Sequence, residues 1–562
     1  MNRRDLFRSF INKSEYSVKE SDFAKSSTTA LGLGTGMNPY TGAWTYQQAK
    51  HLLNRTMFGP THEQIVQAVQ DGLAGTLSKL FQPLADPAPP INYNVTNDPA
   101  CPLGQTWVNA VFNPFIPNLD NGRRLSLASW QMGVMLAEGV SIQEKMTLFW
   151  HGHFVTETVF DSRVVYNNLK LYRQNALGNF KELTKKVTID PCMLRYLNGN
   201  KNTKQAPNEN YARELMELFT LGKGPIAGPG DYTTFTEKDV EEMAKVLTGW
   251  TDFVNENDQN NKVSAIFLNG SHHTGTKTLS HRFNNVQIPN AGNQEYSQLI
   301  DIIFQHPEAP RFIARKLYRW FIYYNIDETI EQNIIEPMAQ MLVQNNFEIQ
   351  PVVEALIKSE HFFDPEIAGC MIKSPLDYII GTLKLFKIVL PDSTQYIKQY
   401  KVWETLFTFS YALQQMYFFA PNVAGWKAYY QSPSFYRLWI NSVTLPLRIR
   451  VLEGLTTVGV PINGDTYKVD VIQLAEISSD PSDPDTLIAD IANYLYPKEL
   501  TTAQKVFLKK VLLPNGLPDY IWPLGWNEYK NNPNDPGKKA AVEQLLRGLL
   551  YTMCDFSEFQ LS

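Results

Sequence analysis

The chain has 562 residues, 43% of them hydrophobic and 19% charged, which is ordinary for a large globular protein. Its 51 Lys and Arg are outnumbered by 56 Asp and Glu. The chain therefore lacks the basic excess that binds a phosphate backbone, and nucleic acid is not an expected partner. No apolar run reaches the roughly 18 residues that a membrane span needs, so no span is expected.

The first segment of the chain, residues 1–40, is polar and predicts a disordered tail. It opens with Asn2-Arg-Arg-Asp-Leu-Phe-Arg8, which resembles the twin-arginine export motif. An export signal continues with about 7–15 apolar residues, whereas Phe10 and Ile11 are the only two before polarity returns. The motif is therefore degenerate. We expect a cytoplasmic protein if the motif is inactive, and a periplasmic or extracellular one if the chain is exported with a partner.

Loops and helices alternate in the rest of the chain. Pro- and Gly-rich stretches at 83–102 and 222–234 predict loops, and 255–293 predicts an irregular excursion with short strands. Between them, apolar residues recur at helical spacing. Ser141-x-x-Glu144 and Thr236-x-x-Asp239 have the pattern of capping boxes that start helices running to Trp150 and Trp250. Further amphipathic helices are predicted at 309–324 and 374–390.

Continuous β alternation is scarce, so we predict a mainly α fold: a large multi-helix globular protein with long irregular loops and at most minor β structure. Residues 41–562 are expected to form this helical domain, which the irregular stretch near 255–300 could divide into two helical lobes. The four cysteines stand far apart and form no C-x-x-C pair, which argues against a zinc ribbon and a disulfide scaffold.

The segment from Asn208 to Leu218 is predicted to be a helix with a sharply polar face. At about 100° per residue, one sector of this helix collects four polar side chains, those of Asn210, Arg213, Glu214 and Glu217. Two carboxylates one turn apart beside an arginine could bind a metal or act as acid and base on a substrate. The candidate catalytic residues are therefore Arg213, Glu214 and Glu217, with Asn210 as a candidate pocket residue.

The alternative for this helix is a solvated surface on which Arg213 pairs with Glu209 and Glu217, each one turn away. Its carboxylates lack the Glu-x-x-His spacing of di-iron bundles, and H-E-x-x-H is absent from the chain. G-x-S-x-G, Walker A and G-x-G-x-x-G motifs are absent too, which removes the esterase, nucleotide-driven and Rossmann dehydrogenase classes. Both interpretations of the helix stay open.

Two histidines flank a glycine in Phe149-Trp-His-Gly-His-Phe154. Gly152 suits the end of the preceding helix, and in an extended exit His151 and His153 would point the same way, as metal ligands must. Because a catalytic zinc takes three protein ligands, Glu157 or the helical carboxylates would have to complete the site. The alternative is a pair of imidazoles that are hydrogen-bonded inside an aromatic cluster.

Two loops offer further candidates. Ser271-His-His-Thr-Gly-Thr-Lys277 could supply a metal ligand from His272 and an anion contact from Lys277, or it could dock onto the helices. Phe419-Ala-Pro-Asn-Val-Ala-Gly-Trp426 contains Asn422 and Trp426, which could form a pocket wall. Packing is favoured for this second loop, since a Trp with small neighbours lies more often in a core than in a cleft.

A series of segments, in their order along the chain, resembles the bacterial family catalogued as domain of unknown function 1800. The matching segments are His51–Thr61, Trp150–Phe154, Asp190–Leu197, Ala206–Gly222, Leu247–Trp250, Arg315–Leu317, Lys373–Pro375, Pro421–Trp426 and Glu558–Gln560. The resemblance implies a large, mainly helical protein with no settled activity. It also implies a partner from a second family, similar to alkaline phosphatases and sulfatases.

Two functions follow as hypotheses. The first is a scaffold or partner-binding protein that works with a phosphatase- or sulfatase-like partner, and it is favoured because no complete catalytic motif is visible. The alternative is a metal-assisted hydrolase or oxidase with a His/Glu cluster. In that alternative, a divalent metal would be the cofactor, and its ligands would come from His151, His153 and His272.

Overall fold

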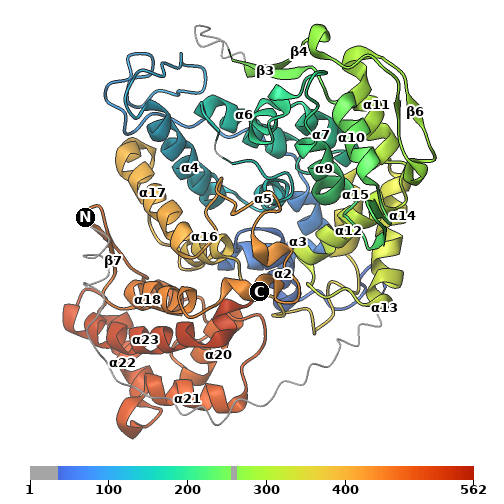
Figure 1. Ribbon diagram of the computed structural model, residues 1–562. Helices are drawn as coiled ribbons and strands as arrows, with labels where there is room; N and C mark the ends of the chain where they lie inside the picture. The colour runs from blue at the N-terminus through green and yellow to red at the C-terminus, as the bar shows by residue number, and fades with distance from the viewer. Residues whose placement is uncertain (1–35, 158, 255–262) are drawn as a thin grey trace. The chain divides into compact units, whose positions relative to one another are not determined.

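The structure, a computed structural model, describes residues 36–157, 159–254 and 263–562 (Figure 1). Helices make up 56% and strands only 7%, which confirms the predicted mainly α fold with minor β structure. The described residues belong to one compact unit, and its division into two lobes near 255–300 stays a prediction. The twin-arginine motif and the tail to residue 35 lie outside the described residues. No described helix has both the length and the apolar character to cross a membrane.

Polar caps start the first helices. Thr45 caps α2 (Tyr46–Thr56), and Thr61 forms a capping box on α3 (His62–Leu80). The predicted loop at 83–102 follows, then α4 (Leu119–Ala137) and α5 (Gln143–His153). The predicted capping box at Ser141 is wrong. Its hydroxyl accepts from Gln143 N, and the Glu144 carboxylate is bound by the Arg173 guanidinium instead. α5 is buried along nearly all its length and forms part of the core.

Helices α6 (Ser162–Gln174), α7 (Phe180–Thr188) and α8 (Pro191–Tyr196) lead to the predicted polar helix. That helix begins as α9 (Asn210–Glu214) and changes at Leu215 into a π-helix (Leu215–Thr220). We call the two together the signature helix, Asn210–Thr220. A π-helix is rare and often occurs at functional sites.

The described strands form short antiparallel pairs. These are β1 (Ile226–Gly228) with β2 (Asp231–Tyr232), β3 (Trp250–Val254) with β4 (Val263–Phe267), β5 (Lys277–Thr278) with β6 (Gln287–Ile288), and β7 (Val460–Ile462) with β8 (Asp465–Tyr467). The predicted excursion with short strands is thus confirmed. The capping box at Thr236 is confirmed too: it starts α10 (Glu237–Val246), which ends before the predicted Trp250. α11 (Glu295–Ile303) follows β6.

The middle of the chain is helical again. Its elements are α12 (Glu308–Phe321), α13 (Glu328–Ile330), a second π-helix (Glu331–Ile335), α14 (Glu336–Gln344), α15 (Ile349–Ile357), α16 (Pro375–Leu385) and α17 (Tyr396–Ala412). The helices predicted at 309–324 and 374–390 are confirmed as α12 and α16, each slightly shorter at its end. α17 packs along α4 (Figure 1).

The last helices gather around α23. They are α18 (Thr444–Thr456), α19 (Val471–Ala475), α20 (Pro484–Leu495), α21 (Thr502–Leu512), α22 (Ile521–Asn531) and α23 (Pro536–Asp555), of which α18, α19, α21 and α22 contact α23. Lys50 of α2 joins this group to the first helices, because its buried ammonium donates to the carbonyls of Asn493 and Tyr496. The core thus brings together segments from both ends of the chain.

Candidate functional site

The polar face of the signature helix lies at the surface. Asn210 is exposed and Arg213, Glu214 and Glu217 are half-buried, whereas the opposite side packs into the core. Arg213 holds Glu237 of α10 with two hydrogen bonds of 3.0 and 2.8 Å. Burial and the neighbouring Glu217 raise the pKa of the Glu214 carboxyl.

The ion pairs of this face differ in part from the prediction. The pair of Arg213 with Glu209 is confirmed at 3.2 Å, but its pair with Glu217 is wrong, since Glu217 pairs with Lys223 at 3.6 Å. Competing partners are the physical reason. The Arg213 guanidinium is held by two hydrogen bonds to Glu237 of α10, and Glu217 pairs with Lys223.

The two histidines of α5 do not point the same way. The prediction of an extended exit at Gly152 is wrong, because α5 continues through His153 and the two side chains diverge around the helix. His151 is buried and stacks on Tyr417 with 4.7 Å between ring centroids. Its Nε2 accepts a hydrogen bond from the backbone N–H of Phe418 at 3.1 Å. Burial lowers the pKa of His151 to about 3.

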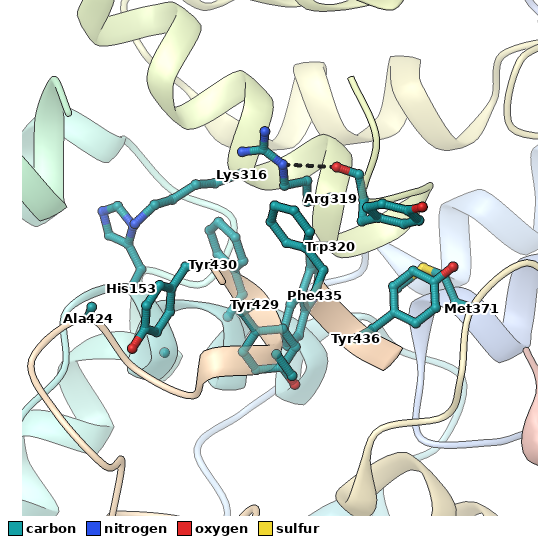
Figure 2. Close-up of a pocket in the computed structure, with 14 residues that line it drawn as sticks. His153, Lys316, Arg319, Trp320, Met371, Ala424, Tyr429, Tyr430, Phe435 and Tyr436 are labelled. Atoms are coloured by element: carbon teal, nitrogen blue, oxygen red, sulfur yellow. Dashed lines mark hydrogen bonds between the residues drawn. The ribbon is translucent and has the colours of Figure 1, made fainter. Parts of the chain in front are cut away.

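His153 and Lys316 together bind the end of the signature helix. His153 Nε2 donates to the Phe219 carbonyl at 2.9 Å, while its Nδ1 accepts from Lys316 Nζ at 3.0 Å. Lys316 Nζ also donates to the Leu218 carbonyl at 2.9 Å, and Figure 2 shows its side chain extended toward His153. The last carbonyls of a helix lack partners within it, so this pair caps the π-helix.

The same environment sets the charge of the pair. Burial and the nearby Lys316 hold the pKa of His153 well below its usual range, and burial and Arg319 lower the pKa of Lys316 to about 7. His153 is therefore neutral at pH 7, with its proton on Nε2. The half-buried Lys316 exchanges its proton near neutral pH, so it is the group's cation only in its protonated form.

His272 and Lys277 belong to another buried network. His272 Nε2 and the Lys277 ammonium each contact one carboxylate oxygen of Glu295, and all three side chains are fully buried. His272 Nδ1 lies 2.9 Å from the Thr248 carbonyl, and the backbone N–H of Ala291 donates to Glu295 at 2.9 Å. This network ties the irregular excursion to the start of α11.

The candidate metal ligands therefore lie in separate sets of contacts. His151 contacts the 417–418 segment, His153 the signature helix, and His272 the Glu295 network. Across the part of the chain that the structure describes, three or more His, Cys, Asp or Glu side chains nowhere come together as metal ligands. The histidines and the 213–217 carboxylates do not form the donor set that a divalent metal needs.

The 421–426 loop packs on the end of α5. Trp426 is buried and lies 5.9 Å from the His151 ring, centroid to centroid. Gly425 has a φ of +93°, and a Cβ there would lie 2.8 Å from the Gly152 carbonyl, so the close approach of the two backbones requires glycine. Asn422 is exposed and exchanges hydrogen bonds with the Tyr430 hydroxyl at 2.9 and 3.3 Å.

His153 and Lys316 also line a cleft, which we call the α12 cleft (Figure 2). It is lined by Phe149, Gly152 and His153 of α5, Lys316, Arg319 and Trp320 of α12, and Tyr324, Met371, Ala424, Ala428, Tyr429, Tyr430, Phe435 and Tyr436. The cleft has a volume of about 60 Å³, or about 600 Å³ when open solvent is counted. It has room for a small group rather than a large ligand.

The charge of the α12 cleft is positive, because its lining contains Arg319, Lys316 in its protonated form, and no carboxylate. Arg319 donates from Nε to the Tyr324 carbonyl at 3.2 Å and lies 5.3 Å over the Phe435 ring. Within the described residues, neither Lys316 nor Arg319 forms an ion pair, in contrast to Arg315 on the same helix, which pairs with Glu308 and Glu331.

A smaller hollow shares Trp320, Met371, Tyr429 and Tyr436 with the α12 cleft, and its further lining includes Arg55, Lys145 and Asp377. Lys145 pairs with Asp377. Arg55 is buried, donates only to uncharged groups, and leaves its Nε without a partner among the described residues. The indole Nε1 of Trp320 has none either.

Sequence reasoning found this site only in part. The sequence predicts His153 as a metal ligand, whereas Asn422 and Trp426, predicted as a pocket wall or as packing, lie outside the lining of the cleft. Lys316, Arg319 and Trp320 were missed, although their i, i+3, i+4 spacing puts them on one face of a predicted helix. A search for cations on aromatic helix faces would have found them.

Comparison with known proteins adds one finding. The model of the family described as "Protein of unknown function (DUF1800)" matches residues 51–560. No curated protein sequence matches the chain, and no solved structure does.

Proposed function

The chain belongs to the DUF1800 family, and from that premise we propose that it is a non-catalytic binding protein whose α12 cleft takes an anionic group attached to a flat ring. One observation carries the proposal. Lys316 and Arg319 line a cleft of aromatic side chains, and neither has a carboxylate partner among the described residues. A cation that is removed from water without a counter-charge costs several kcal/mol, which a bound anion would offset.

The geometry favours an oxyanion as the bound group. Arg319 uses Nε on the Tyr324 carbonyl, and its planar guanidinium suits a carboxylate, phosphate or sulfate. The Trp320 Nε1–H, which has no partner among the described residues, is a further donor at the junction with the smaller hollow. The rings of Tyr430 and Phe435 line the same space and would pack against an aromatic body.

A phosphatase- or sulfatase-like partner is part of this proposal, and the resemblance to the family supports it. An anion-binding cleft matches such a partner chemically, because phosphate and sulfate esters are anions. Co-elution of the two purified chains in size-exclusion chromatography is the expected result, and separate elution at micromolar concentrations would contradict it. The alternative metal-assisted hydrolase has no comparable support, since its ligands lie in separate sets of contacts.

Binding of benzoate tests the cleft. We expect benzoate to bind the whole chain in calorimetric titration and benzyl alcohol, which is neutral, to bind far more weakly. Arg319→Met should weaken benzoate binding at least about tenfold, because a charged hydrogen bond contributes roughly 1.5–3 kcal/mol. Arg315→Met is the matched control, since Arg315 is on the same helix and pairs with Glu308 and Glu331 outside the cleft lining.

The two arginine variants decide the outcome together. Benzoate affinity should fall in Arg319→Met and stay within about twofold of wild type in Arg315→Met. Equal losses in both variants, or benzoate binding no tighter than that of benzyl alcohol, would sink the proposal. Phenyl phosphate and phenyl sulfate, titrated in the same way, then distinguish a carboxylate site from one for phosphate or sulfate esters.

A further inference from the structure

A further hollow lies at the start of α5, and we call it the α4–α17 groove. It runs between α4 and α17, which pack along each other (Figure 1). The start of α5 and the 84–87 segment complete its lining. Its volume is about 340 Å³, several times that of the α12 cleft and within the range of small-molecule sites.

The walls of the groove are mostly apolar. Trp130 of α4 is buried, and its indole Nε1 donates to the Ala88 carbonyl at 2.7 Å. Trp403 of α17 is half-buried and packs directly on Gly133, where a Cβ would lie 2.5 Å from its ring. Val134 adds to the same wall. Arg173 already lies over the Trp130 ring, 5.1 Å from its centroid, so Trp403 is the indole that can attract an organic cation.

Two of the three charged side chains that line the groove satisfy each other. Arg173 donates from Nε to Glu144 Oε1 at 2.6 Å and from Nη2 to Glu144 Oε2 at 3.1 Å. Gln131 completes this buried set, because its Nε2 donates to Glu144 at 2.8 Å and its Oε1 accepts from Arg173 at 2.7 Å. The pair is neutral overall and has no spare charge for a ligand.

Glu138 is the third charged residue, and one of its carboxylate oxygens can still accept a hydrogen bond or contact a cation. Its side chain is 8% exposed, and Oε1 accepts from the backbone N–H of Glu144 at 2.9 Å. Its Oε2 is buried without a hydrogen-bond partner among the described residues. Lys384 of α16 donates to the backbone carbonyl of Glu138, not to its carboxylate. The lining therefore contains one carboxyl more than its cations neutralise.

We propose that the α4–α17 groove binds an organic ammonium ion with an apolar body, whose charge lies against Glu138 and the Trp403 ring. This site is independent of the anion site in the α12 cleft. The charge complementarity of the Glu138 carboxyl, which has no ion-pair partner among the described residues, and the Trp403 indole carries the assignment. A neutral sugar or alcohol would use the rings but would not need the carboxylate.

The affinity of such a site depends on pH. Burial and Glu144 raise the pKa of Glu138 to about 8, against smaller opposing effects of its hydrogen bonds and of Lys384. The charged groups that face Glu138 are Glu144 of α5, Lys384 of α16 and, through Glu144, Arg173 of α6. Glu138 is mostly protonated at pH 7 and mostly ionised at pH 9, so the affinity for a permanent cation should rise about tenfold between these values.

Benzyltrimethylammonium is the probe, because its charge does not titrate. In calorimetric titration of the whole chain, we expect its affinity to rise about tenfold from pH 7 to pH 9. Glu138→Gln should abolish that rise and weaken binding at pH 9 at least about tenfold. The glutamine oxygen can still accept from Glu144 N, which keeps the start of α5 capped. Benzyl alcohol is the neutral comparison and should bind the same at both pH values.

A second variant keeps the proposal testable even if Glu138→Gln does not fold. Trp403→Leu, at a half-buried position, should weaken the binding of benzyltrimethylammonium but leave the pH dependence of its affinity in place. A pH-independent affinity, equal binding to Glu138→Gln at pH 9, or tighter binding of benzyl alcohol would each overturn the proposal. Arg319→Met should leave benzyltrimethylammonium binding unchanged, so failure of this site is distinguishable from failure of the anion site.

Discussion

Lowering the pH from 6 to 4.5 is expected to reduce the free energy of unfolding by roughly 4 kcal/mol. Buried histidines are the cause. Burial lowers the pKa of His51 and of His151 to about 3 and that of His361 to about 4, and it holds the pKa of His153 well below its usual range. The folded chain keeps these imidazoles neutral, whereas the unfolded chain protonates them near pH 6.5.

The sign follows from which state binds more protons. Below pH 6.5 the unfolded chain binds more protons at these histidines, so acid favours unfolding. The free energy of unfolding falls by about 1.4 kcal/mol per pH unit for each histidine, or about 5.5 kcal/mol per pH unit for four. Asp190 and Glu138 oppose this. Burial raises their pKa values to about 6 and about 8, so in this window they bind protons more tightly when folded. Each of these two carboxyl groups offsets about 1.4 kcal/mol per pH unit, so the net loss of unfolding free energy is roughly 3 kcal/mol per pH unit.

Urea unfolding at pH 6, 5.25 and 4.5, followed by tryptophan fluorescence, measures this loss. The variant His151→Phe is the control, because it keeps a ring against Tyr417 and removes one titrating group. It lowers stability at every pH by removing the acceptor of Phe418 N, but its dependence on pH should be shallower by about 1.4 kcal/mol per unit. A urea midpoint that does not change with pH, or an unchanged slope in the variant, would contradict the explanation.

The parts of the fold that the sequence predicted are those that local chemistry determines. Thr236 with Asp239 specifies the start of α10, and Ser374 followed by Pro375 specifies that of α16, because a cap needs only residues a few positions away. Loops rich in Gly and Pro were predicted for the same reason. The capping box at Ser141 failed because the Glu144 carboxylate binds Arg173, which follows it by 29 residues.

The candidate site was harder to predict because it depends on contacts between distant segments. Gly152 is a permitted end for a helix, yet α5 continues to His153, whose ring caps a π-helix that begins with residue 215. No local pattern signals that π-helix. Lys316 resembles any amphipathic lysine until the carbonyl of Leu218, 98 residues before it, becomes its partner. The unpaired charge of the cleft is therefore a property of the assembled structure.

Arg173→Met is expected to lower the free energy of unfolding by roughly 3–5 kcal/mol, because it leaves the Glu144 carboxylate buried without its counter-charge. Methionine keeps the apolar stem but cannot replace the two hydrogen bonds to Glu144 or the cation 5.1 Å over the Trp130 ring. Arg213→Met is the matched control. Arg213 also makes a bidentate pair, with Glu237, but both partners are more than 30% exposed, so its loss should stay below about 1 kcal/mol.

Urea unfolding at pH 7.5 compares the two variants, and a double variant isolates the mechanism. If the unpaired charge causes the loss, Arg173→Met with Glu144→Leu should be more stable than Arg173→Met alone, because the double variant buries no charge at this position. Losses in the two single variants that agree within about 1 kcal/mol would show that burial does not set the strength of these pairs. A double variant less stable than Arg173→Met would show that Glu144 stabilises α5 through Gln131 and not through its charge pair.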